Sequence, residues 1–173
     1  MKSKLLLKIV FAVIFLSAVV QLFFSYAGMW INLTSSMPPG IYLEKKGEIH
    51  RNDYVISCLP SNAAKLGQER RYVGYGNCHL HTAPVGKKMV ARAGDHAQID
   101  KDGIRVNGKL LRNTEPSLFD AQKRNLKHFE LKRKLEDNEV LLAVEKKNSF
   151  DARYFGPSSV ADIRSTVEPL YLF

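Results

Sequence analysis

A serine in a proline-stiffened turn is the side chain of this sequence best placed to do chemistry. Ser36 is followed by Met37, Pro38 and Pro39, and a long apolar run ends only a few residues before it. A serine hydroxyl is a weak nucleophile, so it needs a neighbouring base to accept its proton. These residue types predict acyl transfer by a nucleophile that works close to a bilayer surface.

A lysine fits this serine better than a histidine does. The sequence has 5 histidines, but Ser36 lacks the surrounding Gly-x-Ser-x-Gly pattern that accompanies a histidine-based triad. A Ser-Lys dyad is the other known arrangement. Its lysine must be neutral, which requires apolar burial to lower the pKa from about 10.4 by about three units. Lys87 and Lys88 precede the apolar residues 89–91, so both are candidates, and a pair of ordinary surface lysines is the alternative.

The elements that must position these residues begin with an apolar N-terminal segment. Residues 9–31 carry no charged side chain. At about 1.5 Å per residue, a helix of this length spans the ~30 Å hydrocarbon core of a bilayer. Lysines precede the run and no charge follows it until Glu44, so the positive-inside rule places the N-terminus in the cytoplasm. We therefore expect residues 1–31 to form a cytoplasmic tip and membrane anchor, and residues 32–173 to form an exported domain.

A cleaved secretory signal is the alternative interpretation of this segment. Ser25-Tyr26-Ala27 has the small-x-small pattern of a cleavage site. The apolar core of such a signal is about 7–15 residues long, and this run is longer. The length favours an uncleaved anchor, and both interpretations export the rest of the chain.

The exported part is long enough for one domain and carries a net positive charge. Its roughly 140 residues support a single core rather than two. The formal net charge of the chain is +9, to which Lys2, Lys4 and Lys8 of the N-terminal tip contribute. Outside the cytoplasm, a basic surface fits anionic lipid headgroups better than nucleic acid. We expect membrane lipid, and no nucleic acid, among the partners.

The two cysteines, Cys58 and Cys78, are expected to form a disulfide. In an exported protein an even pair most simply does so. A metal site is the alternative, because Cys78-His79-Leu80-His81 places three ligands together. A second ligand pair at zinc-finger spacing does not accompany them. The sequence therefore predicts the disulfide, with no metal and no cofactor.

Short runs of β-forming residues, divided by turns, predict a mostly β domain. Asn107-Gly108 is a strong signal for a tight hairpin within residues 104–111. Residues 140–144 are apolar throughout, which is typical of a buried strand. We expect a single β domain without internal repeats or an interdomain linker.

One helix is expected inside this domain, at residues 119–137. Phe119, Leu126 and Phe129 fall near one helical face, among several lysines and arginines. The pattern predicts a helical insertion at residues 112–138 with a solvated, amphipathic helix that covers the sheet. A membrane-surface or substrate-docking role is the alternative.

Three segments, in order, resemble the sequence boxes of the signal peptidase I family of membrane-bound serine proteases. Ser36-Met37-Pro38 resembles its nucleophile box. Residues 87–95 resemble its general-base box, in which a lysine lies eight residues before the Asp of a Gly-Asp turn. Counting back from Asp95 selects Lys87 over Lys88. Residues 148–156, Asn-Ser-Phe-Asp-Ala-Arg-Tyr-Phe-Gly, resemble the third box, Asn-Ser-x-Asp-Ser-Arg-Tyr-Trp/Phe-Gly.

The resemblance implies a signal-peptidase-like β domain on a single N-terminal transmembrane helix, with a Ser-Lys dyad. Ser36 would be the nucleophile and Lys87 the general base. The Ser36 N–H and the Thr34 hydroxyl would stabilise the oxyanion, and a turn-capping role is the alternative for Thr34. Ser35 is a second possible nucleophile, which the Met-Pro spacing disfavours.

The third box implies a supporting shell around the lysine. Ser149 would hydrogen-bond the amine of Lys87 and orient it. Asp151 and Arg153 would pair and brace the site. A carboxylate next to Lys87 would raise the pKa of the amine, which argues against Asp151 as a direct base.

Departures from the family pattern point to its conjugative-transfer branch, the TraF type. The Gly-Asp-Asn motif of bacterial housekeeping enzymes is missing ahead of the third box, and Ala152 replaces the usual serine. This branch matures the pilin precursor of a conjugative type IV secretion system, and it is associated with cyclising the product. The resemblance implies a membrane-inserted, pilin-like precursor as partner, and an inner-membrane protein with a periplasmic catalytic domain.

Two other functions stay open on the sequence. One is a general signal peptidase that removes signal peptides from exported proteins. The other is a non-catalytic, membrane-anchored assembly component. By family analogy, the substrate pocket should be shallow and apolar and should prefer small residues at the first and third positions before the cut.

Overall fold

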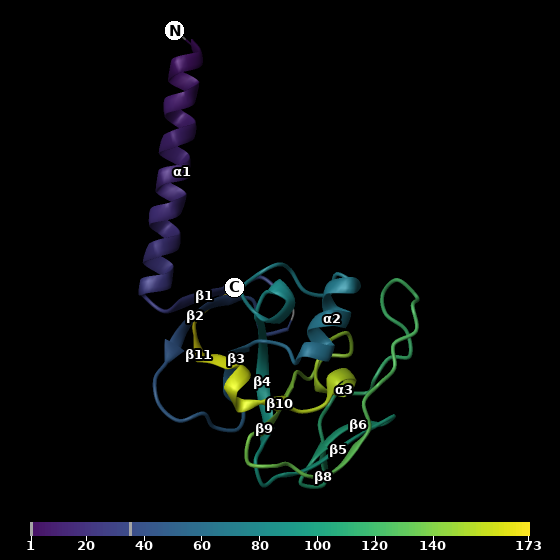
Figure 1. Cartoon of the computed structure of the whole chain (residues 1–173). Coiled ribbons are helices and arrows are strands. Elements are labelled where there is room, and N and C mark those ends of the chain that lie inside the picture. Colours follow the sequence, from purple (N-terminus) through teal and green to yellow (C-terminus); the bar gives the residue numbers. More distant parts are fainter. Residues whose placement is uncertain (1, 35) are drawn as a thin grey trace.

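The computed structural model describes residues 2–34 and 36–173. Within this part of the chain, most regular structure is β, as the sequence predicts. Figure 1 shows one long helix that stands apart from a body built of strands and short helices.

The long helix, α1, spans Lys2–Tyr26. Its Lys4–Phe24 stretch is long and apolar enough to cross a membrane, and the rest of the described chain buries none of it. Tyr26, the middle residue of the Ser25-Tyr26-Ala27 motif, is the last residue of this helix. The side chain of Ser25 lies outside the described part. An apolar surface of this size requires a cover, which a bilayer would supply.

The apolar run does not form one helix up to residue 31, because α1 ends at Tyr26. The chain turns at Gly28, whose φ is 62°, and Met29–Asn32 form strand β1. β1 pairs with β2, Gly40–Lys45, in antiparallel register. The backbone groups of these last apolar residues are thus satisfied by a sheet instead of a helix.

The larger of two sheets carries the site. Among the described residues its strands run in the order β1-β2-β11-β3-β4-β9-β10, with antiparallel neighbours throughout. The further strands are β3 Tyr54–Ser57, β4 Val85–Arg92, β9 Glu139–Ala143, β10 Ser158–Ser159 and β11 Ile163–Leu172. The buried strand predicted at residues 140–144 is confirmed by β9.

The smaller sheet packs on the end of the larger one. Its described strands run in the order β7-β6-β5-β8. Their bounds are β5 His96–Asp100, β6 Gly103–Val106, β7 Lys109–Leu110 and β8 Leu131–Lys134. Val90 of β4 and Leu141 of β9 share one core cluster with Ile99 and Ile104. The hairpin predicted at Asn107-Gly108 joins β6 to β7.

The predicted helix at residues 119–137 is wrong, because this segment contains no helix. Asp120 Oδ1 accepts hydrogen bonds from the backbone N–H groups of Gln122 and Arg124, both at 2.9 Å. Such local bonds from an aspartate compete with helix formation. Lys123 has a φ of 60°, which a right-handed helix excludes. The rest of the segment supplies β8.

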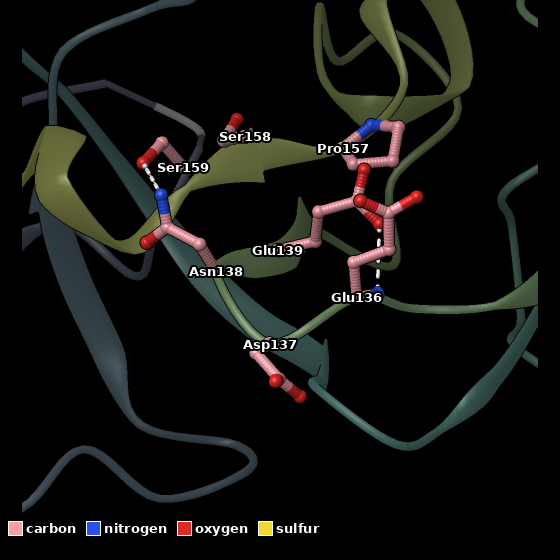
Figure 2. A pocket seen from close by; sticks show the side chains of 7 residues that line it. All are labelled: Glu136, Asp137, Asn138, Glu139, Pro157, Ser158 and Ser159. Atoms are coloured by element: carbon pink, nitrogen blue, oxygen red, sulfur yellow. Dashed lines mark hydrogen bonds between the residues drawn. The ribbon is translucent and has the colours of Figure 1, made fainter.

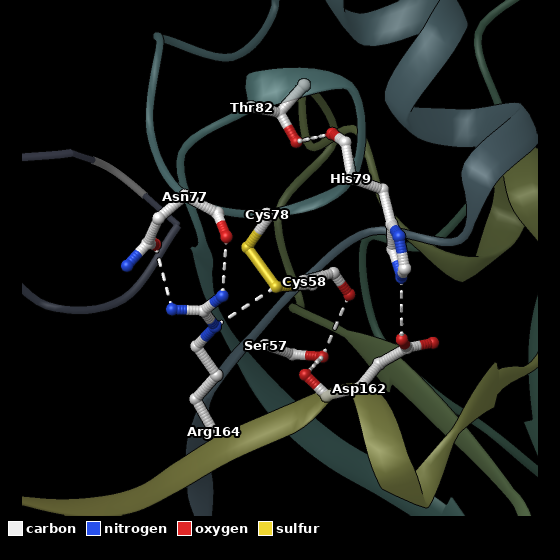
Figure 3. Close-up of a disulfide and its surroundings, with 8 residues drawn as sticks. All are labelled: Ser57, Cys58, Asn77, Cys78, His79, Thr82, Asp162 and Arg164. Atoms are coloured by element: carbon white, nitrogen blue, oxygen red, sulfur yellow. Dashed lines mark hydrogen bonds and ion pairs between the residues drawn. A yellow bond between two sulfur atoms is a disulfide. The ribbon is translucent and has the colours of Figure 1, made fainter.

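The disulfide predicted between Cys58 and Cys78 is confirmed (Figure 3). It closes a loop that contains α2, Ser61–Glu69, and the short helix η1, His79–His81, follows it. The Arg164 guanidinium donates to Cys58 Sγ at 3.1 Å. The metal alternative is wrong, since the Cys78 sulfur is bound to Cys58 and is no thiolate ligand.

Replacing both cysteines by serine should lower the free energy of unfolding by about 3 kcal/mol, because the unfolded chain regains the entropy of an open loop. Urea denaturation of the full-length protein in detergent, followed by circular dichroism, measures this change. Adding reductant should lower the urea midpoint of the wild type and should leave the urea midpoint of the double variant where it was. If the double variant had the same urea midpoint as the wild type without reductant, the prediction would be contradicted.

Candidate active site

The turn that carries Ser36 joins β1 to β2 and is organised by Asn32. The Asn32 side-chain amide donates to the carbonyl oxygens of Thr34 and Met37, both at 2.9 Å, and of Pro38 at 3.2 Å. Its Oδ1 accepts from the Thr34 N–H and hydroxyl. The sequence analysis missed Asn32, whose signal is a polar residue that ends an apolar strand. A single amide holds most of the turn.

Met37 docks this turn onto β4. Its side chain is 2% exposed and belongs to a core cluster with Tyr42 and Ile56. A Cβ atom at Gly86 would lie 2.5 Å from Met37 Cε, so a larger residue there would require the methionine side chain to shift. Gly86 precedes Lys87 in β4. The buried methionine therefore brings the neighbouring Ser36 to the lysine.

The structure brings Ser36, Lys87 and Ser149 together from three distant segments. The Lys87 amine lies 3.4 Å from Ser36 Oγ and 2.9 Å from Ser149 Oγ. The lysine is only 3% exposed. Three of the residues selected from the sequence boxes thus form one contact network.

Burial lowers the pKa of the Lys87 amine from 10.5 to about 8. The Asp151 carboxylate raises this pKa and the Arg153 guanidinium lowers it, so the two neighbours oppose each other. With a pKa near 8, about one lysine in ten is neutral at pH 7, whereas an ordinary lysine is almost entirely charged. The amine is therefore suited to accept a proton from a hydroxyl.

Asp151 and Arg153 form a fully buried, bidentate ion pair. Nε and Nη2 of Arg153 each lie 2.8 Å from a carboxylate oxygen of Asp151. Arg153 also donates to the carbonyls of Val144, Lys146 and Lys147. These bonds hold the loop that leads to Ser149. Asp151 accepts hydrogen bonds from Arg153 and from the Val144 N–H, which matches a bracing position.

Thr34 lies where a turn cap would lie. Its Oγ1 accepts from the Ser36 N–H at 3.4 Å and lies 2.7 Å from Asn32 Oδ1. Because a carboxamide oxygen only accepts, the hydroxyl proton of Thr34 occupies this second bond. A role of Thr34 in stabilising the oxyanion stays a prediction. That role requires the Thr34 hydroxyl to rotate away from Asn32 Oδ1 when substrate binds. Ser35, the second possible nucleophile, lies outside the described residues.

Two hollows meet at Ser36. One, of about 410 Å³, has a polar lining that includes Asn113 and Lys147. The other, of about 420 Å³, also reaches Lys87 and is bounded by aromatic and aliphatic side chains. A polypeptide that crosses Ser36 would meet different chemistry on the two sides.

A further hollow of about 740 Å³ lies between the start of β9 and β10 (Figure 2). Its polar groups bind one another. Glu139 accepts from both Arg133 Nη groups and from the Glu136 N–H, and Asn138 donates to Ser159. In the described part of the chain, no three His, Cys, Asp or Glu side chains are grouped to hold a metal ion.

Sequence comparisons with known proteins identify one family, and a comparison with solved structures is given beside them. A family model described as "Signal peptidase, peptidase S26" matches residues 2–172. Two Escherichia coli proteins named "Plasmid transfer protein TraF" are 33% and 32% identical to the chain over 147 residues, or 83% of this chain and 83% of each relative. A signal peptidase I crystal structure from Enterococcus faecalis V583 aligns with a TM-score of 0.41 and 13% identity, over 72% of this chain and 100% of that one.

Replacing Lys87 by methionine should raise the free energy of unfolding at pH 7. A pKa lowered from 10.5 to about 8 costs the folded state about 3 kcal/mol at about 1.4 kcal/mol per unit. Since the folded pKa lies below the unfolded one, this cost is fully present below pH 8 and disappears as the pH rises toward 10.5. The advantage of Lys87→Met should therefore shrink over that range. Denaturation at pH 7 and 10.5 measures it, and a pH-independent difference would contradict the burial argument.

Replacing Asn32 by alanine should lower turnover by about tenfold or more, because a misplaced nucleophile loses its near-attack geometry. The pH dependence set by Lys87 should stay unchanged. Steady-state kinetics across pH 6–10 measures both the turnover number and its pH dependence. Asn138→Ala is the matched control, since it removes an exposed amide that bonds only Ser159 Oγ. Equal turnover of the two variants would exclude a positioning role for Asn32.

Proposed function

The chain belongs to the signal peptidase family, peptidase S26, and on this premise we propose that it is a membrane-anchored serine endopeptidase with a Ser36-Lys87 dyad. The observation that carries the proposal is the buried Lys87 amine. It lies between two hydroxyls, at 3.4 Å from Ser36 Oγ and 2.9 Å from Ser149 Oγ. Its pKa of about 8 makes it a base near neutral pH.

The proposed reaction proceeds through an acyl-enzyme. Ser36 Oγ attacks the scissile carbonyl while neutral Lys87 takes the hydroxyl proton. The protonated lysine then gives this proton to the leaving amine as the peptide bond breaks. Water then attacks the ester carbonyl while neutral Lys87 takes its proton, and the lysine returns this proton to Ser36 Oγ as the ester bond breaks. Ser149 keeps the amine directed at Ser36 throughout.

The oxyanion is proposed to bind between the Ser36 N–H and the Thr34 hydroxyl. Each such donor is worth about 3–4 kcal/mol in the transition state. Both donors are engaged within the turn, the Ser36 N–H by Thr34 Oγ1 and the Thr34 hydroxyl by Asn32 Oδ1. A developing negative charge would compete with Asn32 Oδ1 for the Thr34 proton.

The membrane position rests on two apolar surfaces. α1 is exposed along its length. The end of β11, which pairs with β2 on the side where α1 leaves the body (Figure 1), exposes Tyr171, Leu172 and Phe173. We place the N-terminus in the cytoplasm and the catalytic domain in the periplasm, where the net charge of the chain favours the anionic inner membrane.

The proposed substrate is a membrane-inserted, pilin-like precursor of a conjugative type IV secretion system. Support comes from relatives whose names refer to plasmid transfer and conjugal transfer, among them a 27% identical protein of Agrobacterium fabrum (strain C58 / ATCC 33970) that the chain covers over 84% of its length. If an amine of the precursor replaced water in the second step, the product would be circular. Mass spectrometry distinguishes the two products by the mass of one water molecule.

Ser36→Ala and Lys87→Ala should each lower precursor processing by at least about 10³-fold, as removal of a catalytic nucleophile or base does. For the wild type, kcat/KM should rise about tenfold per pH unit below pH 8 and level off above it, because only neutral Lys87 accepts the proton. Processing by the purified full-length protein in detergent, followed by gel shift, gives both results.

Lys88→Ala is the control, since it removes the neighbouring lysine of the same strand. Processing by Lys87→Ala at the wild-type rate would exclude the dyad, and absence of processing by the wild type would leave the non-catalytic assembly component. Equal cleavage of a pilin precursor and an ordinary preprotein would favour the general signal peptidase.

A further inference from the structure

A short hairpin forms one wall of the hollow beside Ser36 and Lys87. It spans residues 117–126, with a β-bridge between Phe119 and Asn125 and a backbone hydrogen bond from the Leu126 N–H to the Leu118 carbonyl. Leu126 is buried, whereas Phe119 is 55% exposed at the wall of the hollow. The hairpin overlaps the first part of the segment, residues 119–137, where the sequence predicts a helix.

Asp120 latches this hairpin to the segment that follows α2. The Tyr72 hydroxyl donates to Asp120 Oδ2 at 2.6 Å, and Arg124 Nε donates to the same oxygen at 2.7 Å. Arg70 Nη1 lies 3.6 Å from that oxygen and donates to the Asn125 carbonyl. The Asp120 side chain is 4% exposed. Buried, charge-assisted bonds of this kind fix geometry more firmly than surface ion pairs do.

The other side of the latch is itself restrained. Arg70 and Tyr72 lie in the loop that the Cys58–Cys78 disulfide closes. The covalent link limits how far this loop can move, so the latch holds the hairpin against a fixed support. The hollow is therefore preformed rather than assembled by substrate.

The lining of the hollow includes a cluster of aromatic side chains. The Phe150 ring lies 5.0 Å from the Tyr72 ring and 6.0 Å from the Tyr154 ring, centroid to centroid. The Tyr154 hydroxyl accepts from the Ser117 N–H, which ties the hairpin to this cluster. Phe119 and Val73 complete the apolar wall. Aromatic rings at such spacing bind a further ring or a large aliphatic group well.

We propose that this hollow is a subsite for a large apolar side chain of the substrate polypeptide, and that the hairpin at residues 117–126 determines this preference. The inference rests on the proposed peptidase function, because the same hollow is lined by Ser36, Lys87 and Ser149. A volume of about 420 Å³ far exceeds that of one methyl group. The subsite thus differs from the positions that the family resemblance assigns to small residues.

Internally quenched peptides test the subsite with the full-length protein in detergent. The peptides keep alanine at the first and third positions before the cut. Each other position within three residues of the cut is varied among Ala, Leu and Phe. One position should favour Phe over Ala by about tenfold or more in kcat/KM, since a hydrophobic pocket discriminates by about tenfold or more for a single buried methylene.

Variants of the hairpin should change the ratio of kcat/KM for the Phe peptide to kcat/KM for the Ala peptide. Phe119→Ala should reduce the ratio of kcat/KM for Phe to that for Ala to below about threefold, because one of the four aromatic side chains that line the hollow is lost. Ala121→Trp should fill the hollow, which Ala121 lines, and make the Ala peptide the better substrate. Leu118→Ala is the matched control, since this exposed neighbour does not line the hollow, and its ratio should equal that of the wild type.

Different outcomes overturn the subsite and the proposed function. Cleavage of the alanine peptides with equal kcat/KM for Ala, Leu and Phe at every position would overturn the subsite and leave the peptidase intact. A wild-type ratio in both Phe119→Ala and Ala121→Trp would overturn the role of the hairpin. Failure of the wild type to cleave any peptide or any precursor would overturn the proposed function, and the subsite with it.

Discussion

The burial of one amine is the constraint on which the rest of the structure depends. Lys87 lies 3% exposed inside a sheet, where removal of water lowers its pKa to about 8. A charged group in such a place destabilises the folded state, and only close neighbours make it tolerable. The hydroxyls of Ser36 and Ser149 supply hydrogen bonds without charge. In the proposed mechanism this destabilisation is useful, because a lysine that is costly to protonate is a good base.

The scaffold serves this burial by bringing three loops onto β4. The first loop contains Ser36, and Met37 holds it on β4 by packing against Gly86. Hydrogen bonds from the Asn32 side chain fix the turn within this loop. The Asp151–Arg153 pair holds the second loop through backbone carbonyls. Its two charges act on the pKa of Lys87 in opposite directions, and the Asp151 carboxylate, which raises this pKa, has the larger effect of the two. The third segment, the latched hairpin, closes the hollow and gives the cleft an aromatic side.

Much of the site could be predicted from the sequence because its chemistry depends on residue type and short spacing. The eight-residue step from Lys87 to Asp95 selects one of two adjacent lysines, and their different burial in β4 agrees with that choice. Residues 119–137 could not be predicted in this way. Their charge pattern fits a helix, but the Asp120 carboxylate binds local N–H groups and residues brought close only by folding. Such contacts leave no periodic signal in the chain.

The sequence by itself determined the family boxes, the cysteine pair, the apolar N-terminal helix and the mostly β class, because each follows from local composition or spacing. Only the tertiary structure decided that Met29–Asn32 leave the helix and join a sheet, that Asn32 organises the Ser36 turn, and that a hairpin walls the cleft. The physical reason is that burial and hydrogen bonding between distant segments set these features. A lysine becomes a base only when the whole sheet has closed around it.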